Sequence, residues 1–116
     1  GTAGGGNVNT RPPASDNSSN MSSSENRREG QKQQLAGQYK KAVTYYTRAL
    51  DGAGDDAAPI HYQIGLCHQR LDENAAAIEH YNSAIKSYKE MIAAGKNVEA
   101  ATRGIKASES GIKVCQ

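Results

Sequence analysis

The sequence has no tryptophan and no phenylalanine, only two cysteines and three prolines, and no long apolar run. A membrane-spanning helix needs about 20 predominantly apolar residues in succession, so no membrane span is expected. Two distant cysteines are too few for a disulfide scaffold and too far apart for a zinc knuckle. A net charge of +2, spread over 116 residues, does not favour a nucleic-acid-binding protein.

The first 22 residues differ in composition from the rest of the chain. They are mostly Gly, Asn, Ser, Thr and Pro, so residues 1–22 are predicted to be a disordered tail or tether. A spacer of this type also follows the anchoring cysteine of many bacterial lipoproteins, although this segment contains no cysteine. A cell-envelope and a cytoplasmic location both stay open, as does whether the tail is native or marks a fragment boundary. Residues 23–116 are predicted to form one small domain.

Helical spacing of apolar residues dominates after residue 22, and no strand pattern occurs. Five helices are predicted, over about 23–36, 38–50, 57–71, 75–94 and 98–116. The first should be the weakest, because it is polar on nearly all sides. One of the serines at 22–24 is expected to cap it, with Glu25 in its first turn. Asp55 or Asp56 is expected to cap the third helix, with Pro59 in the first turn of that helix.

The chain repeats itself at a shift of 35 residues. The matched pairs are Gly30 with Gly65, Ala42 with Ala77, Tyr46 with Tyr81, and Ala49 with Ala84. The small residues allow antiparallel helices to approach closely, and the tyrosines fill the space toward the next pair. The order of small and aromatic residues therefore predicts two equivalent helix pairs.

These spacings resemble the tetratricopeptide repeat, a helix pair of about 34 residues. The segment from Tyr39 to Leu50 is similar to the second helix of that repeat, and Gly30 and Gly65 match the glycine of its first helix. The resemblance implies a short right-handed all-α solenoid, with repeats at about 23–56 and 58–95 and a capping helix at about 98–116. The sequence departs from the family where an aromatic residue is usual, at Gln33 and His68.

The resemblance implies a protein–protein interaction module or adaptor, because the first helices of such repeats line a concave groove that binds extended peptides. The residues carried over to this groove are Arg27, Gln31, Gln34, Tyr62, Leu66, Gln69 and Arg70. Arginine favours carboxylates, so the expected partner is a protein or peptide with acidic groups or a free C-terminus. One branch of the family clamps the C-terminal carboxylate of heat-shock chaperones. The equivalent positions here hold Arg27, Gln31 and Gln63, which match that clamp only in part.

Three other interpretations stay open. The chain is expected to be a monomer or to associate weakly, but its repeats could instead stack on a second copy as a self-assembly module. It could also be an accessory domain of a larger bacterial cell-envelope protein of the lipoprotein type. Finally, the groove residues could simply be a solvated helix face.

No catalytic, cofactor or metal site is expected. His61 and His68 lie seven residues apart, but a metal site needs a third ligand at a defined distance, and His80 is on another helix. His68 is expected to replace a packing aromatic residue, and His61 and His80 are expected at the surface. Cys67 lies on an apolar helix stripe, where a thiol is a poor nucleophile.

Cys67 and Cys115 are expected to lie near one another, because the third and fifth helices should run side by side. A disulfide and two buried free thiols are both compatible with this arrangement. A disulfide would favour an oxidising compartment.

Overall fold

The computed structural model describes residues 20–116, and within them every regular element is helical. The elements are α1 (Ser23–Leu35), α2 (Tyr39–Ala49), the short 3-10 helix η2 (Gly54–Asp56), α3 (Ala57–Arg70), α4 (Asn74–Ala93) and α5 (Val98–Cys115). The prediction of an all-α fold with five α-helices is confirmed. No helix in these residues is long and apolar enough to cross a membrane. The predicted tail of residues 1–22 lies, up to residue 19, outside the described residues.

The ends of α1 follow from local hydrogen bonding. The Ser22 hydroxyl accepts a hydrogen bond from the Glu25 N–H at 3.1 Å, and the Glu25 carboxylate accepts one from the Ser22 N–H at 2.8 Å. This reciprocal pair is a capping box, and it lowers the pKa of Glu25. Gly37 follows α1 with φ +78°, a left-handed conformation that favours glycine. Helix α1 therefore begins and ends within about a residue of its predicted limits.

The start of α3 differs from the prediction. Residues 54–56 form the 3-10 turn η2, which runs directly into α3, and Asp56 at the N-cap makes no side-chain capping hydrogen bond. The Asp56 carboxylate instead lies 3.8 Å from Arg27, and Asp55 lies 3.3 Å from Lys96. Asp56 thus occupies the predicted N-cap position, but its side chain does not cap the helix, because the turn before α3 already has αR backbone geometry there.

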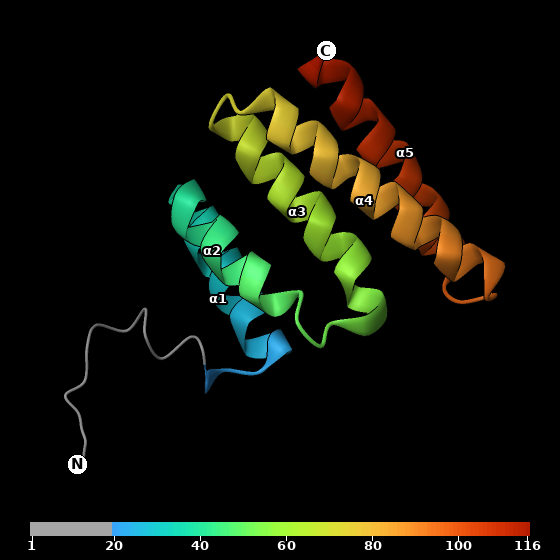
Figure 1. The fold of residues 1–116 in the computed structure, drawn as a ribbon, viewed down its shortest axis with the longest axis horizontal. Coiled ribbons are helices and arrows are strands. Elements are labelled where there is room, and N and C mark those ends of the chain that lie inside the picture. The colour runs from blue at the N-terminus through green and yellow to red at the C-terminus, as the bar shows by residue number, and fades with distance from the viewer. Residues whose placement is uncertain (1–19) are drawn as a thin grey trace.

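Successive helices pack against one another along the chain, as Figure 1 shows with α1 and α2 at one end and α5 at the other. Helices α1 and α2 form a first helix pair, and α3 and α4 form a second. Helix α5 packs on α4 and also contacts α3. The arrangement is that of a short array of antiparallel helix pairs closed by one extra helix.

One tyrosine fills the interior of each helix pair. Tyr46 and Tyr81 are 2% and 0% exposed. A Cβ atom added to Gly30 would lie 2.8 Å from the Tyr46 ring, and one added to Gly65 would lie 2.8 Å from the Tyr81 ring. The predicted role of these glycines in close helix approach is confirmed.

Helix α5 also packs glycines against tyrosine rings. The comparison of the sequence with itself did not reveal these contacts. A Cβ atom on Gly111 would lie 2.5 Å from the Tyr81 ring, and one on Gly104 would lie under 3.0 Å from the Tyr88 ring. Two glycines seven residues apart on α5 thus lie over two tyrosines seven residues apart on α4. Tyr81 is held between α3 and α5, with a glycine on each side.

Candidate functional site

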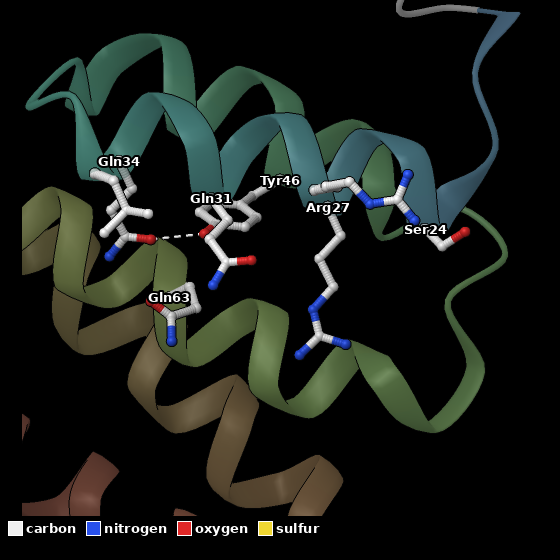
Figure 2. A pocket seen from close by; sticks show the side chains of 8 residues that line it. Ser24, Arg27, Gln31, Gln34, Tyr46 and Gln63 are labelled. Carbon is white, nitrogen blue, oxygen red and sulfur yellow. Dashed lines mark hydrogen bonds between the residues drawn. The ribbon is translucent and has the colours of Figure 1, made fainter.

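A groove with a volume of about 400 Å³ lies between α1 and α3. Its lining residues are Ser24, Arg27, Arg28, Gln31, Gln34, Leu35, Tyr46 and Gln63. Helix α1 supplies six of these eight, α2 supplies the tyrosine and α3 supplies one glutamine. Figure 2 shows Arg27, Gln31 and Gln34 on the side of α1 that faces α3, with Gln63 opposite them on α3.

The polar face of α1 is turned into this groove because Gly30, on another face of the helix, packs on Tyr46. The Tyr46 hydroxyl donates a hydrogen bond to the Gln34 side-chain oxygen at 2.6 Å, drawn as the dashed line in Figure 2. That bond fixes Gln34 and leaves its NH₂ group as a donor toward the groove. Gln31 and Gln63 add two more amide groups to the wall.

Arg27 supplies positive charge inside the groove. Its side chain is 40% exposed and lies 3.8 Å from the carboxylate of Asp56, which is 69% exposed. Burial raises the pKa of Tyr46 to about 12 and also raises the pKa of Tyr88, and the charge of Arg27 opposes both increases.

The structure divides the seven predicted groove residues into three sets. Arg27, Gln31 and Gln34 line the groove together. Tyr62 and Leu66 are half-buried and pack in apolar clusters to which α5 contributes.

The remaining two predicted residues lie near the end of α3. The Gln69 side-chain oxygen accepts a hydrogen bond from the Tyr81 hydroxyl at 2.7 Å, and Arg70 is exposed. A role in partner binding stays a prediction for all seven residues.

The groove also contains residues that the predicted set omitted. Ser24, Arg28 and Leu35 line it from α1, Tyr46 lines it from α2, and Gln63 lines it from α3. Ser24 and Leu35 continue the three- and four-residue spacing set by Arg27 and Gln31, so helical periodicity could have found them. Leu35 is 83% exposed and is the only large apolar residue of α1.

Three histidines form a second polar group, here called the histidine cluster: His61, His68 and His80. The Nδ1 atoms of His61 and His80 are 3.1 Å apart, and the His80 ring stacks on both other rings at centroid distances of 5.3 and 5.5 Å. His61 and His80 are half-buried, and burial lowers the pKa of each. The prediction that these two lie at the surface is wrong, because they meet across the contact between α3 and α4.

The surroundings of His68 explain its position in the histidine cluster. Within residues 20–116 no group of three or more His, Cys, Asp or Glu side chains is placed to hold a metal ion. His68 lies 2.8 Å from the carboxylate of Glu73 and stacks on His80. This agrees with its predicted role as a replacement for a packing aromatic residue.

Both thiols are buried and free. Burial raises the pKa of Cys67 to about 11, so this thiol stays protonated and unreactive at neutral pH. Of the two arrangements that the sequence left open, the structure has two buried free thiols rather than a disulfide.

A comparison with protein families gives a match over residues 58–91 to the tetratricopeptide repeat. Residues 58–91 form one tetratricopeptide repeat. The match covers α3 and most of α4, and it confirms the resemblance seen in the spacing of Gly65, Ala77 and Tyr81. Neither a curated protein nor a solved structure matches the chain. Tetratricopeptide repeats are in general non-catalytic elements of protein–protein interaction, and no catalytic family is matched.

Proposed function

We propose that this chain is a protein-interaction module that binds an extended, acidic peptide segment in the groove between α1 and α3. The observation that carries this proposal is the composition of the groove wall. Two of its eight lining residues are arginines, three are glutamines, and none is acidic. A ligand with carboxylate groups would therefore meet positive charge without a competing negative residue in the wall.

The three glutamine amides favour an extended peptide over a compact ligand. A peptide backbone in an extended conformation presents N–H and C=O groups that have no partners within its own chain. Amide side chains both donate and accept hydrogen bonds, so they can pair with such a backbone along the length of the groove. Because Gln34 is held by Tyr46, part of this wall is fixed before a ligand arrives.

The ion pair of Arg27 with Asp56 does not close the groove to a ligand. Both side chains are exposed and the separation is 3.8 Å, so the pair contributes little to stability. A ligand carboxylate can replace Asp56 at the guanidinium.

A display library of random peptides, selected on the full chain, tests the proposal. We expect the recovered peptides to be rich in Asp and Glu, to weaken with added salt, and to lose affinity for Arg27→Glu. Arg103→Glu is the matched control, because Arg103 is exposed on α5, outside the groove. Selected peptides that bind Arg27→Glu as well as the unaltered protein would place the binding site elsewhere.

A further inference from the structure

We infer, on the basis of the proposed function, that the groove recognises two peptide side chains four positions apart. One is acidic and binds beside Arg27, and the other is apolar and packs on Leu35. The inference follows from the unequal chemistry of the two ends of the groove and from the distance between them.

One end of the groove is cationic. Ser24, Arg27 and Arg28 line it near the start of α1, and Figure 2 shows Arg27 extending across the groove toward α3. An arginine guanidinium binds a carboxylate through charge-assisted hydrogen bonds. This end therefore suits an Asp or Glu side chain.

The other end is apolar. Leu35 is the last residue of α1, lines the groove, and is 83% exposed. Every other large side chain of α1 is polar or charged, so this leucine is not part of an apolar helix face that packs on the protein. An exposed leucine at the edge of a polar groove offers an apolar contact for a ligand side chain.

The distance between the two ends sets the spacing. Eight residues separate Arg27 from Leu35, which corresponds to about 12 Å along the helix at about 1.5 Å per residue. An extended peptide rises about 3.3 Å per residue, so about four residues cover that distance. Side chains of an extended chain alternate between two faces, and an even spacing places both on the face toward the groove. A spacing of three or five would turn one of them away.

The centre of the groove does not fix the direction of the peptide. Gln31 and Gln63 offer both donors and acceptors there. The inference therefore predicts the spacing for both chain orders, acidic residue first or apolar residue first.

Fluorescence polarisation with labelled synthetic peptides tests the inference. Each peptide carries one Glu and one Leu in a Ser/Thr background, separated by three, four or five positions, in both orders. At a spacing of four, we expect the peptide with the more favourable order of Glu and Leu to bind about tenfold more tightly than peptides with a spacing of three or five. A tenfold change corresponds to the loss of one charge-assisted hydrogen bond. Equal binding at all spacings, or no binding below about 1 mM, would overturn the inference.

Two variants separate the two contacts. Arg27→Gln should abolish the preference for Glu over Gln in the peptide and keep the preference for Leu over Ser. Leu35→Ser should do the reverse. Because both side chains are at least 40% exposed, neither change should unfold the protein. Arg103→Gln and Val114→Ser, at exposed positions on α5, are the matched controls.

The display selection described above distinguishes failure of the spacing from failure of the proposed function. Arg27-dependent peptides without a four-position spacing would overturn the spacing and leave acidic peptide binding in place. No Arg27-dependent peptide at all would overturn both.

Discussion

The two helix pairs have equivalent interior packing. They differ in the residues on one face of the first helix, the face that lines the groove in the first pair. At a shift of 35 residues, Arg27 of α1 corresponds to Tyr62 of α3, and Gln31 corresponds to Leu66. The polar residues line an open groove, whereas the apolar ones pack in clusters completed by α5. The same helix-pair arrangement therefore has an open face in the first pair and a covered face in the second. The residues at these positions decide which of the two occurs.

The interior is the same in both pairs. In each, a glycine of the first helix packs on a tyrosine of the second, and the tyrosine hydroxyl donates to a glutamine of the first helix. The pairs differ in one respect, because Tyr81 also meets Gly111 of α5, whereas Tyr46 faces only Gly30 among the glycines. The second pair should therefore depend more strongly on its tyrosine.

The largest expected effect comes from removing these tyrosines. Tyr81→Ala should destabilise the protein by about 3–5 kcal/mol, because it leaves a cavity among three helices. Tyr46→Ala should cost less, since the cavity opens at the end of the array, where α1 can shift. Urea unfolding gives both free energies. A larger loss for Tyr46→Ala would contradict the view that α5 makes the second pair the centre of the fold.

A smaller effect is expected from overfilling the close contacts. Ala42 and Ala77 are each 0% exposed and equivalent in the two pairs. Ala42→Leu and Ala77→Leu should each destabilise by roughly 1–3 kcal/mol, because a larger side chain forces the helices apart. Wild-type stability of both variants in chemical denaturation would remove the packing explanation of the repeat. Ala93→Leu, at an exposed position of α4, is the control.

The hydroxyl bonds should contribute equally in the two pairs. Tyr46→Phe and Tyr81→Phe each remove one hydrogen bond to a glutamine, of 2.6 and 2.7 Å, and keep the ring. Each should cost roughly 0.5–1.5 kcal/mol. Thermal unfolding of the two variants side by side measures this. A cost confined to one variant would mean that the two bonds are not equivalent.

Much of this fold could be predicted because it depends on local signals. The five helices, the serine cap of α1 and the close approach at Gly30 and Gly65 all follow from spacing along one helix or from the repeat. Gly104 and Gly111 were missed because α5 lies outside the repeated segment. Their role depends on which tyrosines of α4 they meet, and that is a property of the tertiary packing.

In the candidate site, too, contacts that depend on tertiary packing could not be predicted from the sequence. Arg27, Gln31 and Gln34 were grouped through the resemblance to the repeat, and they share one face of α1, so they line one groove. Tyr62 and Leu66 pack in a cluster to which α5 contributes. This contact depends on how far α5 covers α3, and the residue pattern of a single helix does not encode that. His61 and His80 were misplaced for a similar reason, since their contact joins two helices.

The histidine cluster distinguishes the two helix pairs, and we expect it to make their responses to acid differ. The positions equivalent to His61, His68 and His80 are Asn26, Gln33 and Tyr45, so the first pair has no histidine there. The second pair therefore holds all three imidazoles of the chain.

The smallest expected effect is a loss of stability on mild acidification, located in the second pair. Burial lowers the pKa of His61 and of His80, and the charges of His61 and His68 lower the pKa of His80 further, while Glu79 opposes this. Because the folded-state pKa values are lowered, the stabilisation is complete above about pH 6.5 and is lost as the pH falls through the lowered values. His80→Gln should lose less stability than the unaltered protein between about pH 7.5 and pH 5.5. Urea midpoints at both pH values measure the difference. If both proteins lost the same amount, the acid response would come from carboxylates, and the two pairs would not differ in this property.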